Sequence, residues 1–286
     1  LQDDTAAVRR LLAAGANATA ADRYGVTPIS IAAQNGNPEI LQLLLDAGAD
    51  ANTQLPGGES ILMTAARTGR LPAVEVLLRH GANPNHAEPR RGQTALLWAA
   101  AEGHAPVVTA LIKHGASFNL RLGTGLTPFL VAARNGHRDV LAALIAAGAD
   151  LHQIVEVPPD HPHKATRIAA APRPGSTALH LAVLSGHFEL AAWLLDQGAN
   201  PNAAASGWTA LHAITGVRKP GLGDNDPAPY GSGNLSSLDL VRKLKAKGAD
   251  LNARMTKRIN VGLTSLNTLG ATPFLLAARA ADSELM

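Results

Sequence analysis

Apolar residues in this chain of 286 residues are grouped into short stripes separated by polar turns. One stripe runs from Thr27-Pro28 to Gly36, and the next runs from Asn37-Pro38 to Gly48. Within each stripe the apolar residues recur every three or four positions, as they do on one face of an α-helix. Threonine or asparagine followed by proline is typical of a helix start, and glycine after the last apolar residue is typical of a helix end. The pattern therefore predicts two short antiparallel helices joined by a tight turn.

This two-helix pattern recurs in a fixed register. A Gly-Ala dipeptide ends the second helix, with intervals of about 33 residues at first and about 50 residues in the last two cases. Its glycines are Gly15, Gly48, Gly81, Gly115, Gly148, Gly198 and Gly248. A second glycine stands two residues before the threonine or serine that begins the first helix. These glycines are Gly25, Gly58, Gly92, Gly125, Gly175, Gly207 and Gly270. A single helix pair cannot bury its apolar faces alone, so we expect the pairs to stack on their neighbours.

Residues 177–200 contain the clearest form of the repeat. Residues 177–182 read TALHLA, and Gly186-His187 and Gly198-Ala199-Asn200 follow. These motifs resemble an ankyrin repeat, a unit of about 33 residues with the signature T-P-L-H-x-A. The resemblance covers nearly the whole chain outside three insertions. It implies an all-α ankyrin-repeat solenoid of helix-turn-helix units joined by β-turn fingers.

We expect one array over residues 1–286 that is incomplete at both ends, because the first unit lacks an inner helix and the last lacks an outer helix. The expected units are 1–24, 25–57, 58–91, 92–124, 125–174, 175–206, 207–269 and 270–286. Loop insertions rich in proline, glycine or polar residues are expected at 152–173, 217–235 and 254–268. Insertions in such an array often lie on the binding face, although tolerated lengthening of a surface loop is the alternative.

The seventh unit contains distinctive motifs at residues 207–212, 218–235 and 262–267. They resemble a group of bacterial ankyrin repeat proteins that are commonly predicted to be exported and whose activity is unknown. This resemblance implies a periplasmic or exported protein, while a cytoplasmic location stays open.

Composition narrows the functional classes. Aromatic residues make up 3% of the chain, so the core must be built from Ala, Leu, Val and Ile. Because the chain has no cysteine, disulfides, cysteine metal sites and thiol catalysis are excluded. No apolar run approaches the roughly 20 residues of a membrane-spanning helix. The formal net charge of +3 does not by itself call for a polyanionic partner.

Candidate catalytic and metal-binding residues have simpler structural explanations. His104, His137 and His187 follow a turn glycine, and His180 and His212 occupy the Leu-His position of the repeat, where a bond to neighbouring backbone is expected. His161-Pro162-His163 beside Asp160 could ligate a metal ion, but a loop with no fixed third ligand is better explained as exposed surface. The chain has no GxxxxGK[ST] phosphate loop and no GxSxG motif. We therefore expect neither an enzyme nor a bound cofactor or metal.

Arginine gathers at two kinds of position that face a partner in this architecture: the finger tips before the second glycine, and the inner helix after its alanine pair. Trp208 lies beside one such tip, where it could also simply pack against an insertion. The candidate partner-binding residues are Arg23, Tyr24, Arg67, Arg90, Arg91, Arg121, Arg134, Arg173 and Trp208. Arginine forks bind carboxylates and are enriched at interfaces, but arginines also cap turns and cover apolar surface.

The sequence thus favours a non-enzymatic protein–protein interaction scaffold that holds an acidic partner on a concave, arginine-lined face. Binding of nucleic acid or another polyanion through the same face is a weaker alternative, because aromatic residues for base stacking are scarce. A targeting module for an activity located outside these residues is a further alternative. Self-association through the uncapped ends is also possible in such an array.

Overall fold

The computed structural model describes residues 4–157, 173–218, 232–257 and 268–286. The regular structure of these residues is helical, with no strand and only isolated β-bridges, Gln54–Ser60 and Ile154–Thr177. The chain forms two compact units, which are described separately. Unit 1 comprises Leu1–Leu122 and Ala142–Ala149, and unit 2 comprises Gly123–Leu141 and Asp150–Met286.

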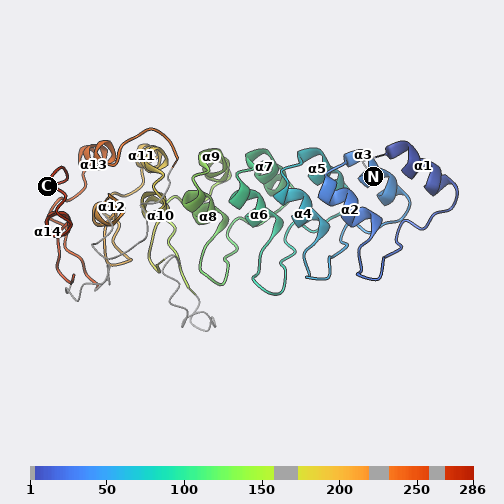
Figure 1. The fold of residues 1–286 in the computed structure, drawn as a ribbon, viewed down its shortest axis with the longest axis horizontal. Coiled ribbons are helices and arrows are strands. Elements are labelled where there is room, and N and C mark those ends of the chain that lie inside the picture. Colours follow the sequence, from blue (N-terminus) through green and yellow to red (C-terminus); the bar gives the residue numbers. More distant parts are fainter. Residues whose placement is uncertain (1–3, 158–172, 219–231, 258–267) are drawn as a thin grey trace. The chain divides into compact units, whose positions relative to one another are not determined.

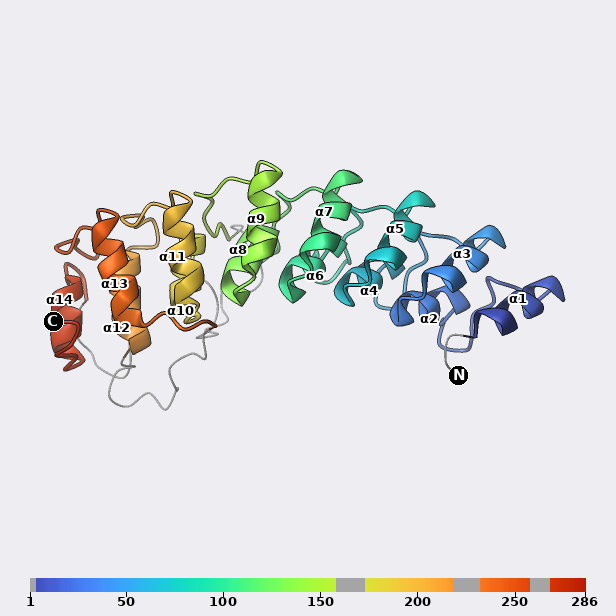
Figure 2. The same ribbon diagram turned by 90° about the horizontal axis from the view of Figure 1, so that it is seen from above.

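Unit 1 is a stack of antiparallel helix pairs. Its inner helices are α2 (Pro28–Asn35), α4 (Ile61–Arg67) and α6 (Ala95–Glu102). Its outer helices are α1 (Thr5–Ala13), α3 (Pro38–Asp46), α5 (Leu71–Arg79) and α7 (Ala105–Lys113). Inner helices pack on inner helices and outer helices on outer helices, so Figures 1 and 2 show two neighbouring rows. As predicted, the first helix is an outer one, and it packs against α3.

Unit 2 repeats the same arrangement. Its inner helices are α8 (Pro128–Asn135), α10 (Ala178–Leu184), α12 (Ala210–Arg218) and α14 (Pro273–Arg279). Its outer helices are α11 (Phe188–Asp196) and α13 (Ser237–Ala246). Helix α9 (Arg138–Ala146) begins in unit 2 and ends in unit 1. Each inner helix of unit 2 packs on the next, and α11 packs on α13.

The predicted helix starts and ends are confirmed in the second helix pair. Thr27 forms a capping box with Ser30, and the side chain of Asn37 accepts hydrogen bonds from the backbone N–H groups of Glu39 and Ile40 at 3.0 and 3.1 Å. These bonds satisfy N–H groups that the first turn of a helix leaves unpaired. Gly48 has φ of +91°, a left-handed conformation that glycine adopts without steric cost. The sequence alone is therefore sufficient to place this turn.

Alanine pairs allow the inner helices of unit 1 to approach one another. Both alanines are buried in each of the three helices, and the pairs are Ala32-Ala33, Ala65-Ala66 and Ala99-Ala100. Leucine, isoleucine and valine side chains fill the remaining space between the rows, in agreement with a core that is poor in aromatic residues. Stability thus depends on contacts between adjacent pairs.

Asparagine side chains connect one helix pair to the next at the start of the fingers. The amide of Asn52 donates to the Gly81 carbonyl at 3.1 Å, and its oxygen accepts from the Asn83 backbone N–H at 2.8 Å. Asn85 makes the same two bonds, to Gly115 and Ser117. Each asparagine therefore satisfies two backbone groups of the following repeat, which fixes the spacing between neighbouring repeats.

At the edges of the predicted insertions, the described residues belong to fingers or helices. Val155 exchanges backbone hydrogen bonds with Ser176 and Gly175, so the start of the predicted 152–173 insertion is part of a finger. Helix α12 continues through Arg218, past the expected boundary at 217, because Val217 is buried and Arg218 is ion-paired. Met255 likewise bonds to Ala271. Residues 158–172, 219–231 and 258–267 lie outside the described part of the chain.

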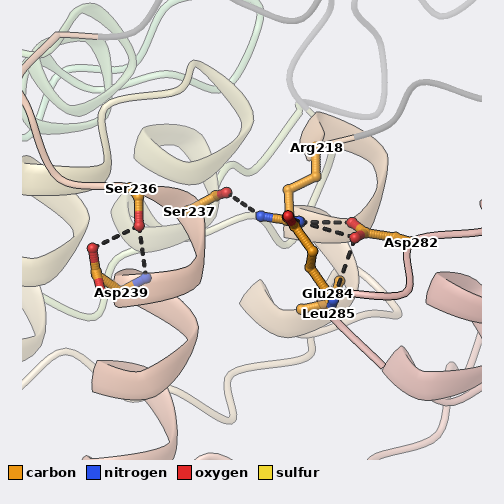
Figure 3. Close-up of polar contacts among 7 residues, drawn as sticks. All are labelled: Arg218, Ser236, Ser237, Asp239, Asp282, Glu284 and Leu285. Carbon is orange, nitrogen blue, oxygen red and sulfur yellow. Dashed lines mark hydrogen bonds and ion pairs between the residues drawn. The ribbon is translucent and has the colours of Figure 1, made fainter.

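A buried ion pair holds the segment that follows α14. The guanidinium of Arg218 donates to both oxygens of Asp282, at 2.6 and 2.9 Å, and also to Glu284 and Ser237 (Figure 3). The side chains of Arg218 and Asp282 are 10% and 1% exposed, whereas that of Glu284 is 72% exposed. The pair therefore ties residues 64 positions apart together in a largely dry setting.

Candidate partner-binding surface

The fingers of unit 1 project beside its inner helices (Figure 1). In the first finger, Asp22 Oδ1 accepts hydrogen bonds from the backbone N–H groups of Tyr24 and Val26 at 2.8 and 2.9 Å. In the third, the carboxylate of Glu88 accepts from the backbone N–H groups of Arg90 and Arg91 at 2.7 and 2.6 Å. Glu88 is only 5% exposed. Both carboxylates therefore turn back to hold the finger backbone.

The arginine side chains of these fingers remain on the surface. Arg23, Arg90, Arg91 and Arg121 are all exposed, and Tyr24 is 63% exposed. The guanidinium carbon of Arg23 lies 4.6 Å from the centre of the Tyr24 ring, within the range of a cation–π contact. Among the described residues, the side chains of Arg90 and Arg91 have no ion-pair partner. The third finger, which carries Arg90 and Arg91, thus presents positive charge to solvent.

Arg67 adds a second kind of surface to unit 1. It is the last residue of α4, is exposed, and has its guanidinium carbon 5.3 Å from the ring centre of half-buried Trp98 in α6. His104 Nε2 lies 3.0 Å from the Arg67 carbonyl oxygen, which links the end of α4 to the start of α7. The sequence prediction did not include Trp98. Its signal is a large aromatic residue in a helix otherwise composed of alanine and leucine except for Glu102 at its end.

Unit 2 contains the other three candidates, and they are less accessible. Arg134 and Arg173 are half-buried, and burial lowers the pKa of each guanidinium below its ordinary value. Trp208 is only 6% exposed, lies under Arg173 at 5.1 Å from ring centre to guanidinium carbon, and its Nε1 has no hydrogen-bond partner in the described residues. The buried Trp208 ring offers little surface to a partner, and its role in binding stays a prediction.

The histidines of the repeat act as the sequence predicted. His180 Nε2 bonds to the Trp208 carbonyl at 2.9 Å, His212 Nε2 to the Ala271 carbonyl at 3.1 Å, and His187 Nε2 to the Arg134 carbonyl at 3.1 Å. Burial lowers the pKa of His180 to about 4 and also lowers the pKa of His212 and of His187. These histidines are uncharged at neutral pH and link neighbouring repeats of unit 2.

The described residues contain no group of three or more His, Asp or Glu that could hold a metal ion, and residues 160–163 lie outside them. No helix in the described ranges is long and apolar enough to span a membrane. An apolar hollow of about 340 Å³ lies between α1, α2 and α3. It is lined by residues that include Val8, Leu11, Leu12, Ile31, Ile40 and Leu44.

The family model described as "Ankyrin repeats (3 copies)" matches residues 1–88 and 62–154, which together span more than half of the chain. The model "Ankyrin repeat" matches residues 174–205. The chain belongs to the ankyrin repeat family. The all-α ankyrin-repeat solenoid that the resemblance of residues 177–200 implied is thereby confirmed. The narrower resemblance to exported bacterial ankyrin proteins stays a prediction.

A solved structure is similar to this ankyrin array. The "Crystal structure of human ASB11 ankyrin repeat domain" matches with a TM-score of 0.63 and 22% sequence identity, covering 89% of this chain and 98% of that chain. At this level of identity the likeness concerns the fold alone. No curated protein matches the chain at a significant level. Ankyrin repeats generally mediate protein–protein interaction, and they are typically not enzymes.

Proposed function

We propose that this ankyrin array is a non-enzymatic scaffold that binds an acidic segment or surface of another protein. Unit 1 supplies the main contacts, through the exposed arginines of its fingers and the Arg67–Trp98 pair on its inner helices. The observation that carries the proposal is the division of roles within the fingers. The acidic side chains Asp22 and Glu88 bond to their own backbone, while Arg90 and Arg91 remain exposed and without an ion pair in the described residues.

The physical argument concerns the partner's charge. A guanidinium presents N–H donors in a planar fork that matches a carboxylate, and such charge-assisted hydrogen bonds are the stronger ones in proteins. Several arginines on neighbouring fingers also raise the association rate with an acidic partner. The hydrogen bonds from Asp22 and Glu88 hold the finger backbone in one conformation, so less of the backbone must be ordered when a partner binds.

Reversal of charge at the finger tips tests the proposal. The triple variant R90E/R91E/R121E should lose at least tenfold in affinity for partners captured from the native source with the wild-type protein. The matched control is R9E/R10E/R79E, which makes the same charge change on exposed residues of the outer helices α1 and α5. If the finger variant keeps wild-type affinity, the assignment to the fingers is refuted. If both variants lose affinity equally, the effect is a general one of net charge and the fingers are not the binding site.

Salt dependence separates a protein partner from a nucleic acid. Affinity for a single-stranded or duplex oligonucleotide falls steeply with salt, because each neutralised phosphate releases counterions. If an oligonucleotide binds more tightly than any captured protein at about 150 mM salt, with this steep slope, the polyanion alternative replaces the scaffold proposal.

A further inference from the structure

The stacked pair of Arg67 and Trp98 differs from the other candidate residues in unit 1, because it joins a charge to an accessible aromatic ring across two helices. Arg67 ends α4, and Trp98 belongs to α6, which packs directly against α4. Arg67 has no ion-pair partner in the described part of the chain. Trp98 keeps part of its ring accessible, unlike Trp208.

This geometry determines which parts of the two side chains remain free to bind. A guanidinium held over an indole ring is partly desolvated on the face that meets the ring, while its N–H groups stay available at the edge. A carboxylate that approaches the edge can accept two hydrogen bonds from the planar fork of the guanidinium. The accessible part of the Trp98 ring then lies next to the bound carboxylate and offers apolar surface.

From this arrangement we propose that Arg67 and Trp98 form the anchor of the surface and select a segment in which an acidic residue is adjacent to an apolar one. This inference rests on the proposed function and specifies the partner's chemistry. The finger arginines supply attraction that depends on net charge alone, whereas the anchor distinguishes an acidic-apolar segment from a purely acidic one. Arginine and tryptophan are the residue types most enriched among the dominant contacts of protein interfaces.

A pair with the same chemistry elsewhere in the chain provides a control. Arg138, at the start of α9, lies over Trp193 of the outer helix α11 at 5.5 Å, and both residues belong to unit 2. The variants W98L and W193L each replace a half-buried tryptophan under an arginine with an apolar residue of smaller size. Only W98L should alter binding, because only Trp98 lies on an inner helix of the proposed surface.

The probes are fluorescein-labelled peptides of sequence (Glu-Glu-Leu)4 and (Glu-Glu-Gly)4, measured by fluorescence anisotropy with the full chain. We expect wild type to prefer the leucine peptide about fivefold, since half-burying a leucine is worth roughly 1 kcal/mol. W98L and R67Q should each abolish this preference, while W193L preserves it. Circular dichroism and the unfolding midpoint establish that each variant is folded.

The outcomes separate the anchor from the underlying function. If R90E/R91E/R121E weakens binding of both peptides but W98L leaves the preference intact, the anchor is wrong and the scaffold proposal stands. If neither acidic peptide binds wild type more tightly than (Lys-Lys-Leu)4, both are wrong. Loss of the preference in W98L and R67Q, with retained binding of (Glu-Glu-Gly)4, supports the anchor.

Discussion

Removal of the Arg218 guanidinium should destabilise the segment after α14 far more than removal of an exposed ion pair would. In R218M the carboxylate of Asp282, 1% exposed, loses two charge-assisted hydrogen bonds, and the Ser237 hydroxyl loses its donor. Breaking a buried ion pair by deleting one partner typically costs about 3–5 kcal/mol, because the other charge stays buried. Consistent with a strong interaction, hydrogen bonding to Asp282 raises the pKa of Arg218.

The measured destabilisation of R218M should be smaller than this, because detachment of the residues after α14 would expose Asp282 to water and remove the cost of its burial. The loss is therefore limited by the free energy that docks this edge segment, and we expect about 2–3 kcal/mol. Native-state hydrogen exchange at the amides of Ala280 and Asp282, which bond to Leu276 and Ala277, reports this local opening directly. Urea unfolding of the whole chain is the second measurement, and it should respond less.

A double-mutant cycle with D282N isolates the pair, since asparagine keeps the side-chain oxygen that accepts from the Leu285 N–H. The double variant should be less destabilised than the sum of R218M and D282N by about 2 kcal/mol. E284Q is the control, because Glu284 bonds to the same guanidinium but is 72% exposed and should contribute at most about 1 kcal/mol. If the coupling is below about 0.5 kcal/mol, or E284Q is as harmful as D282N, burial is not what makes this pair important.

Three further outcomes follow from the described contacts. The pKa of His180 is about 4 in the folded protein, against an ordinary value near 6.5. As the pH falls, the unfolded chain therefore takes up a proton first, and the free energy of unfolding drops by about 3 kcal/mol between pH 6.5 and pH 4. Urea unfolding midpoints across this range should show the loss, and they should depend less on pH in H180Q. A Cβ at Gly136 would lie 2.8 Å from the His187 ring, whereas a Cβ at Gly48 meets nothing within 4 Å, so G136A should lower the thermal midpoint more than G48A although both glycines have positive φ. Ala281 has φ of +50°, so A281G should stabilise the edge by about 1 kcal/mol, seen as slower hydrogen exchange, and a faster exchange would contradict the strain.

The sequence by itself determined the unit length, the helix starts and the roles of the repeat histidines. A threonine or asparagine cap, a proline at the first helical position and a glycine with positive φ act within a few residues of one another, so the local sequence encodes them without reference to the fold. Thr27, Asn37 and Gly48 lie where the pattern placed them for this reason. The exposed finger positions of Arg90 and Arg91 could be predicted in the same way.

Only the tertiary structure decided which distant side chains meet. Arg67 stacks on Trp98, Arg218 binds Asp282 across 64 residues, and Trp208 is buried beneath Arg173. Each contact joins residues of different repeats, and its geometry depends on how closely the helix pairs stack and on where an insertion leaves and rejoins the array. The repeat period determines which repeats are neighbours. The rotation and spacing between two neighbouring repeats are set by the packing of side chains from both. A sequence pattern therefore places arginines on the fingers, and packing between repeats decides which distant side chains meet, as Arg67 and Trp98 do.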